Sequence, residues 1–155
     1  MGITDNDFPV LPTVNLAVSS NTTAESSRNQ ITVTATLSAA VSGNQTVTLN
    51  VGGTGITPSD YSLSTRTLTI PNGQTTATAT FVATDDGIAE GTETAALSLS
   101  TPSSGIALGT TTTQNIAITN NGSSLLTKIG GFTSSNGGEI PAFDPISDRL
   151  FVVAG

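Results

Sequence analysis

The sequence contains no cysteine, no histidine and no tryptophan, and only 10% of its 155 residues are charged. Without cysteine the chain can form neither a disulfide nor a thiolate zinc site. Without histidine it lacks the base of Ser-His-Asp and Cys-His catalysis, and zinc lacks its preferred nitrogen ligand. These absences exclude several classes of hydrolase and of zinc protein.

Positive charge is also scarce, with four Lys and Arg residues and a net charge of −7. Nucleic acid is therefore not expected as a partner, because phosphates are neutralised by clustered Lys and Arg. No apolar run approaches the roughly 20 residues of a membrane helix, so we expect no membrane span in this chain. Abundant Thr, Ser, Gly and Asn with little Lys are typical of bacterial surface or secreted repeat proteins. We therefore expect an extracellular or cell-surface (secreted) location.

Threonine is the commonest residue, with 29 copies, and its branched β-carbon favours strands. Polar and apolar residues alternate with a period of two, and no window shows the helical period. The alternating segments are 13–19, 30–38, 45–51, 66–70, 75–84, 94–100 and 113–119. Alternation of this kind is typical of antiparallel sheets packed face to face. We predict an all-β fold, an immunoglobulin-like antiparallel β-sandwich of seven to eight strands. Asn72-Gly73 predicts a hairpin within it.

Two similar motifs, "ITDND" (3–7) and "ITNNG" (118–122), stand at the edges of the predicted sandwich. If the second ends the last strand of the sandwich, the first would end a preceding copy in a tandem array. Beyond this point the composition changes, and the chain finishes in the apolar "LFVVAG", which would leave an unpaired strand edge. We expect residues 1–8 to end a preceding repeat, 9–122 to form the sandwich, and 123–155 to be the truncated start of a second β domain.

Acidic residues are concentrated in one stretch, "TDDGIAEGTE" (84–93), which contains four carboxylates and no Lys or Arg. Two carboxylates about 5 Å apart repel by roughly 3 kcal/mol at an effective dielectric of about 20. A cation among them would remove this cost. The available donors are all oxygens, which suits Ca²⁺ with its six to eight oxygen ligands, and Mg²⁺ is the second choice. The stretch is not an EF-hand, because its acids are adjacent and strands flank it.

The same stretch, with its flanks "FVATDDGIAEGTETAALSLS" (81–100), resembles the signature of the Calx-beta family of calcium-binding sandwich repeats. Upstream, "GGTGITPSDYSLSTRTLTIPNGQTTATATF" (52–81) and "AES" (24–26) also resemble the family. The resemblance implies calcium ligands, including the main-chain carbonyl of Ile88, at Glu25, Asp60, Asp85, Asp86, Ile88, Glu90, Glu93 and Asn120. All six acids of the predicted sandwich are in this set.

The chain departs from the family pattern at the end of the sandwich. Binding members often close with consecutive aspartates, and here the matching residues are Asn120, Asn121 and Gly122. An amide oxygen can ligate calcium but adds no charge, so this departure predicts fewer ions or weaker binding. The C-terminal "GGEIPAFDPISDRLFVVAG" resembles the first blade of a β-propeller, and a single blade cannot bury its own sheet.

Together these features predict a calcium-binding β-sandwich repeat of a bacterial cell-surface or secreted multidomain protein. Calcium would stiffen the loop end and the junction between repeats, in a structural, adhesive or cell-communication role. The expected partners are calcium ions, neighbouring repeats of the same chain and other surface proteins.

Two other functions are alternatives to calcium binding. A metal-free spacer or ligand-binding module would melt at the same temperature with calcium and with chelator. Paired carboxylates can also hydrolyse glycosides, but one Tyr and no Trp make a poor sugar platform, so we expect no enzyme.

Overall fold

The computed structural model describes residues 10–88, 90–121, 142–144 and 149–151. The chain divides into two compact units, Met1–Ser123 and Ser124–Gly155. Among the described residues the first unit has ten strands and one short 3-10 helix, and the second has two strands. No helix in these ranges has the length and apolar character needed to cross a lipid bilayer.

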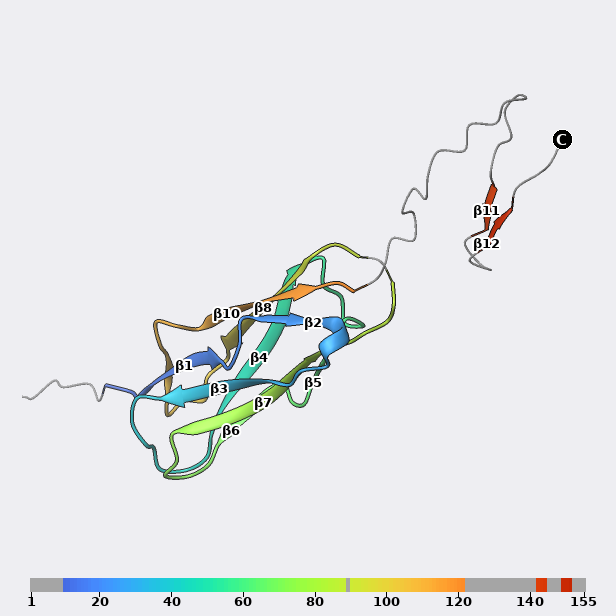
Figure 1. Cartoon of the computed structure of the whole chain (residues 1–155). Helices are drawn as coiled ribbons and strands as arrows, with labels where there is room; N and C mark the ends of the chain where they lie inside the picture. The colour runs from blue at the N-terminus through green and yellow to red at the C-terminus, as the bar shows by residue number, and fades with distance from the viewer. Residues whose placement is uncertain (1–9, 89, 122–141, 145–148, 152–155) are drawn as a thin grey trace, which may run out of the picture. The chain divides into compact units, whose positions relative to one another are not determined.

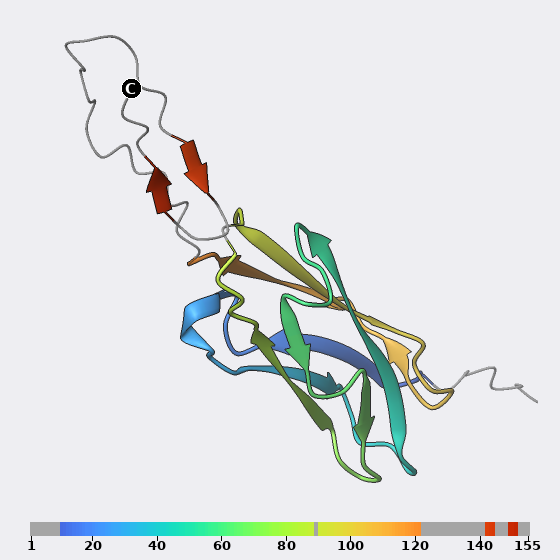
Figure 2. The ribbon, with the colours of Figure 1, turned by 90° about the vertical axis from the view of Figure 1, so that its right-hand side faces the viewer.

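The first unit is a sandwich of two five-stranded sheets (Figures 1 and 2). One sheet has the order β5 (Tyr61–Leu63), β7 (Thr76–Ala83), β3 (Ile31–Leu37), β1 (Thr13–Val18) and β9 (Ala107–Leu108). The other has the order β2 (Thr22–Ala24), β10 (Thr113–Thr119), β8 (Glu93–Ser100), β4 (Gln45–Thr54) and β6 (Thr67–Ile70). The all-β immunoglobulin-like sandwich predicted from the sequence is confirmed.

The seven alternating segments correspond to the seven strands of four residues or more. The additional strands, β2, β5 and β9, have only two or three residues each. Two of them pair in parallel, β9 with β1 and β2 with β10, while the long strands pair antiparallel. The strand count therefore exceeds the predicted seven to eight because three strands are too short to show a period.

The hairpin predicted at Asn72-Gly73 is wrong. A turn is present, and Gly73 adopts a φ of +74°. However, β6 pairs with β4 in one sheet, whereas β7 pairs with β3 and β5 in the other. The turn is fastened to a neighbouring loop, because the Asn72 side-chain oxygen accepts a hydrogen bond from the Gly43 N–H at 2.7 Å. It therefore passes the chain from one sheet to the other.

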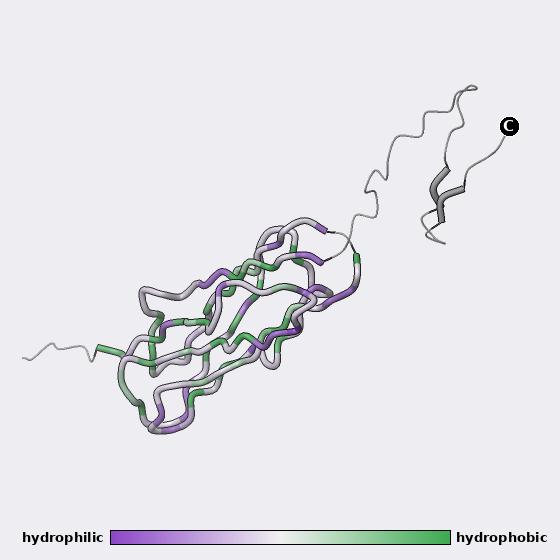
Figure 3. Tube along the Cα trace, viewed as in Figure 1, coloured by the Kyte–Doolittle hydropathy of each residue, from purple (hydrophilic) through white to green (hydrophobic). Residues whose placement is uncertain are grey.

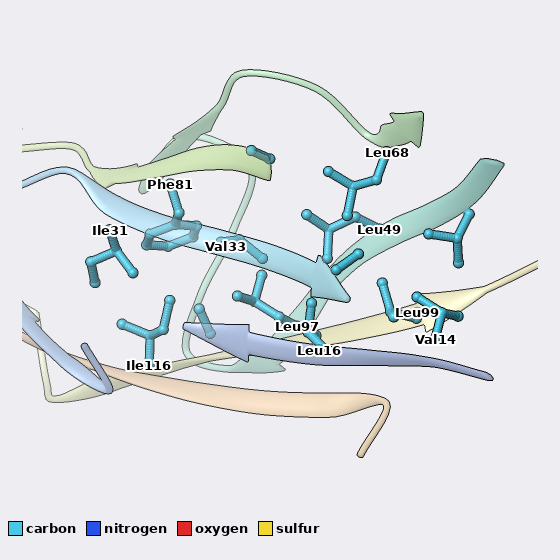
Figure 4. Close-up of a cluster of buried hydrophobic side chains, with 14 of the residues drawn as sticks. Val14, Leu16, Ile31, Val33, Leu49, Leu68, Phe81, Leu97, Leu99 and Ile116 are labelled. Carbon is cyan, nitrogen blue, oxygen red and sulfur yellow. The ribbon is translucent and has the colours of Figure 1, made fainter. Parts of the chain in front are cut away.

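The core lies between the sheets and is built from the inward residues of each alternating strand (Figure 4). In β3 the apolar positions are buried and the threonines between them face outward. The same alternation is visible as short hydrophobic and hydrophilic stretches along the trace (Figure 3). Phe81 is the largest fully buried side chain, and its ring stacks on Tyr61 with centroids 5.4 Å apart. Most other core residues are Val, Leu, Ile or Ala, as the composition predicts.

Gly53, near the end of β4, lets that strand approach β8 closely. Its φ is +141°, a value that side chains rarely permit. A β-carbon at this position would lie 1.8 Å from the main-chain oxygen of Thr94. Since Thr94 follows Glu93 in β8, this close approach sets the spacing of β4 and β8 beside a predicted ligand. Gly52, Gly53 and Thr54 are all paired with residues of β8.

The second unit contains a short antiparallel pair, β11 (Ala142–Asp144) and β12 (Arg149–Phe151), with Phe143 opposite Leu150. Most of the proposed propeller blade, and residues 1–8 of the proposed preceding repeat, lie outside the described residues. Those domain assignments therefore remain predictions.

Candidate metal centre

One end of the sandwich, here called the acidic pole, carries six carboxylates: Glu25, Asp60, Asp85, Asp86, Glu90 and Glu93. The strand directions explain why they meet. Strands β2, β7 and β10 run toward this end and β8 starts from it, so the segments joined to them gather there (Figures 1 and 2). Glu25 opens the 3-10 helix η1 (Glu25–Ser27) directly after β2, and Glu93 is the first residue of β8.

Five of the six acids form two groups of three. In the first group, one carboxylate oxygen from each of Glu25, Glu90 and Glu93 lies within 4.8 Å of the other two. In the second, one oxygen from each of Asp60, Asp86 and Glu90 meets the same limit. Glu90 belongs to both groups. The structure thus brings together residues that are up to 68 positions apart in the sequence, from Glu25 to Glu93.

Two of these carboxylates are buried, and each has one oxygen without a hydrogen-bond partner. The side chains of Glu25 and Glu93 are 2% and 3% exposed, and the Oε2 atom of each makes no hydrogen bond. A buried charge without a partner is costly, so native structures usually pair it or use it to coordinate a metal. Glu25 and Glu93 belong to the same group of three, an arrangement that a positively charged ligand would stabilise.

The pKa values at the pole point in the same direction. Burial raises the pKa of Glu25 above its ordinary value of 4.5, while the N–H of Asn121, hydrogen-bonded to its carboxylate, opposes that rise. Desolvation also raises the pKa of Glu93 and Glu90, and the charge of Asp60 adds to it in both cases. All of the charged neighbours that act on these three groups are other carboxylates. Among the residues that the structure describes, no basic side chain therefore offsets the charge of these three groups.

Asp60 is held in place by its own turn. Its Oδ2 accepts a hydrogen bond from the Thr57 N–H, and its Oδ1 accepts one from the Ser59 hydroxyl at 3.2 Å. Its main-chain oxygen accepts the Thr84 N–H at 2.8 Å, which ties the turn to the end of β7. The Asp60 side chain is 6% exposed. These contacts fix a ligand-type oxygen beside the loop that carries Asp86.

The remaining predicted ligands lie at the rim of the pole. The Asp86 Oδ1 accepts the N–H of Ile88 at 2.9 Å, which closes a tight turn. The carbonyl of Ile88 accepts a hydrogen bond from the Asn120 side-chain nitrogen at 3.1 Å. Asp85 belongs to neither group of three, and its Oδ1 accepts a hydrogen bond from the Asn121 side-chain nitrogen at 3.2 Å. Asp85, Ile88 and Asn120 therefore remain predicted ligands.

The donor set fits a hard cation such as calcium. All of the clustered donor atoms are carboxylate oxygens, which Ca²⁺ and Mg²⁺ prefer to softer or nitrogen ligands. Calcium–oxygen distances of about 2.3–2.6 Å place two ligands of one ion at most about 5 Å apart. Both groups of three already satisfy this limit.

The sequence interpretation gave Asn121 no part in the site. Its main-chain N–H contacts Glu25 and its side chain contacts Asp85, so it joins two segments of the pole. The only signal in the sequence was its position, since it stands where binding members of the resembled family often have aspartate. The direction of its amide could not be read from that position.

No family model matches the chain, and no curated protein matches it in sequence. Among solved structures, CBD12 from CALX1.2 is similar in fold, with a TM-score of 0.60 and 19% identity. That match covers 70% of this chain and 44% of the other, so this chain spans less than half of the CBD12 structure.

Two further structures are similar in fold. The apo form of the Calx CBD1 domain matches with a TM-score of 0.57 and 18% identity over 70% of this chain and 98% of its own. A protein of Bacteroides ovatus, described as a candidate carbohydrate binder, matches with a TM-score of 0.54 and 16% identity, over 70% of this chain and 37% of its own. The sandwich therefore has the fold of Calx calcium-binding domains, and that fold also occurs in a protein with another suggested ligand.

The pKa shifts predict how the stability of the calcium-free protein depends on pH. The pKa values of Glu25, Glu90 and Glu93 are higher in the folded state than in the unfolded chain. These groups therefore destabilise the fold when they are ionised, and the effect is largest above their raised pKa values. Their destabilising effect disappears as the pH falls toward the ordinary value of 4.5. We expect the melting temperature of calcium-free protein to rise from neutral pH to about pH 5.

Thermal melts followed by circular dichroism across this range test the expectation. With calcium present the trend should weaken or reverse, because protons compete with the ion for the same oxygens. A melting temperature that falls steadily on acidification of calcium-free protein would contradict the assignment of these carboxylates as mutually repelling groups.

Proposed function

We propose that the sandwich is a calcium-binding module whose acidic pole holds two neighbouring ions. The observation that carries the proposal is the pair of buried, unpartnered oxygens of Glu25 and Glu93 within a group of carboxylates. One ion would lie among Glu25, Glu90 and Glu93, and the other among Asp60, Asp86 and Glu90. The similarity in fold to Calx calcium-binding domains supports this proposal.

The role of the ions would be structural. Each bound ion would neutralise carboxylates that otherwise repel, and would join η1, the turn before β5, the loop after β7 and the start of β8. At the pole the turn before β5 is joined to the end of β7 by the hydrogen bond from the Thr84 N–H to the Asp60 oxygen. The ions would add links from these two segments to η1 and to the start of β8, and would make this end more rigid. We further propose that the module acts in an extracellular or cell-surface protein, where it stiffens the junction with a neighbouring domain and supports adhesion or cell communication.

Calorimetric titration of the full chain with calcium, after removal of bound metal, tests the proposal. We expect saturable heat with a stoichiometry of two. Binding to the folded state alone adds about 2.7 kcal/mol per site at a hundredfold excess over the dissociation constant. For a domain of this size that corresponds to a rise in melting temperature of roughly 10 °C for one ion.

A titration with magnesium at the same concentrations is the comparison, and weaker binding is expected because magnesium retains more of its water. Heat no greater than dilution, together with equal melting temperatures in calcium and chelator, would overturn the proposal. That result would favour the metal-free spacer.

A further inference from the structure

Two adjacent asparagines, Asn120 and Asn121, donate hydrogen bonds to the loop that follows β7. The Asn120 Nδ2 lies 3.1 Å from the main-chain oxygen of Ile88, and the Asn121 Nδ2 lies 3.2 Å from the Asp85 Oδ1. Both partners are oxygens that can only accept at this pH, one a carbonyl and the other a carboxylate. The chemistry therefore fixes the orientation of each amide, with its nitrogen toward the loop.

The main chain of Asn121 also faces the same part of the pole. Its N–H lowers the pKa of the Glu25 carboxyl and so partly opposes the rise caused by burial. This follows from strand register, because Thr119 of β10 lies beside Ala24 of β2, and the next residues along the two strands remain close. The side-chain N–H groups of Asn120 and Asn121 thus connect the end of β10 to the 85–88 loop, on the side of the pole where β10 lies beside η1.

The two side-chain donors contact a part of the pole that lies outside the two groups of three. Asp85 belongs to neither group, and Ile88 offers only its carbonyl. An N–H that donates to an oxygen places partial positive charge beside it, as a bound cation would. Each amide therefore supplies part of the charge compensation that a cation would give that oxygen. A cation at the same oxygens would have to displace or rotate these amides.

We propose that Asn120 and Asn121 form an amide clamp that replaces a further cation. The clamp holds the 85–88 loop against η1 in the calcium-free protein, and it limits binding to the ions of the two groups of three. The limit on ion number rests on the proposed function, whereas the effect on the calcium-free protein does not.

Substitution of the two asparagines separates these effects. In Asn120→Asp with Asn121→Asp, the side-chain donors are lost and two carboxylates are gained. We expect calorimetry to give one calcium more than the wild type, and the melting temperature of calcium-free protein to fall by roughly 5 °C or more. In Asn120→Ala with Asn121→Ala, the donors are lost without new ligands, so the calcium-free melting temperature should fall and the stoichiometry should not rise.

Asn115→Asp is the control, because this exposed residue of β10 makes the same Asn-to-Asp exchange once, away from the pole. It should leave both readouts at the wild-type value. Unchanged stoichiometry in the double aspartate variant would overturn the limit on ion number. Unchanged calcium-free melting in the double alanine variant would overturn the clamp. If the wild type itself binds no calcium, the proposed function fails, and the clamp is judged by the calcium-free melting temperatures.

Discussion

Replacement of Glu90 by Gln should weaken calcium binding at both proposed ions at once. Glu90 is the residue shared by the two groups of three, so its loss removes one charged ligand from each. Its side chain is exposed, and the exchange preserves its size, so the fold should not change. Calcium affinity depends strongly on the number of charged ligands, and we expect a loss on the order of tenfold or more at each ion. Calorimetric titration measures both affinities.

Asp85→Asn is the comparison for this experiment. It removes the same charge from the same loop, but from a residue outside both groups, and we expect a much smaller loss of affinity. Two results would contradict the shared-ligand arrangement. One is wild-type binding by Glu90→Gln, and the other is loss of one ion with the second unaffected. A larger effect from Asp85→Asn would instead favour the ligand set implied by the sequence resemblance.

Replacement of Gly53 by Ala should destabilise the sandwich strongly. The added β-carbon would lie 1.8 Å from the Thr94 oxygen, and the φ of +141° is unfavourable for alanine. Both effects require β4 and β8 to separate or the strand to twist locally. We expect a loss of roughly 2–4 kcal/mol in the free energy of unfolding, measured by chemical denaturation. Because the displaced residue follows Glu93, calcium affinity should fall as well.

Gly52→Ala is a control at the neighbouring position. A β-carbon there meets nothing within 4 Å, and Gly52 does not have a positive φ. Its free energy of unfolding should therefore change by no more than about 0.5 kcal/mol. If the two variants lose similar stability, the effect of replacing Gly53 comes from strand propensity and not from the close approach of β4 to β8.

The sequence predicts the long strands well because each carries its own alternation. In β3, for example, Ile31, Val33 and Leu37 face the core, and the threonines between them do not. The short strands β2, β5 and β9 are defined by their neighbours rather than by a period of their own. The Asn72-Gly73 turn shows a related limit, because a turn motif specifies a local reversal but does not specify which sheet the next strand joins.

The candidate site was predictable in composition but not in arrangement. Scarcity of charge elsewhere made the six acids of the sandwich stand out, and the structure places all six at one pole. Their division into two groups that share Glu90, with Asp85 outside, depends on how the loops fold back. The burial of Glu25 and the amide directions of Asn120 and Asn121 depend on tertiary contacts that no local pattern records.

The chain begins β1 at the end of the sandwich away from the acidic pole and leaves β10 at the pole itself (Figures 1 and 2). Tension applied between these two points would run along the strands. The ladders that join β10 to β8 and to β2 would then be loaded in shear, with many hydrogen bonds sharing the force instead of opening one after another. An ion bound by η1, which follows β2, and by the start of β8 would link the two strands on either side of β10. This link would lie at the point where the force leaves the domain.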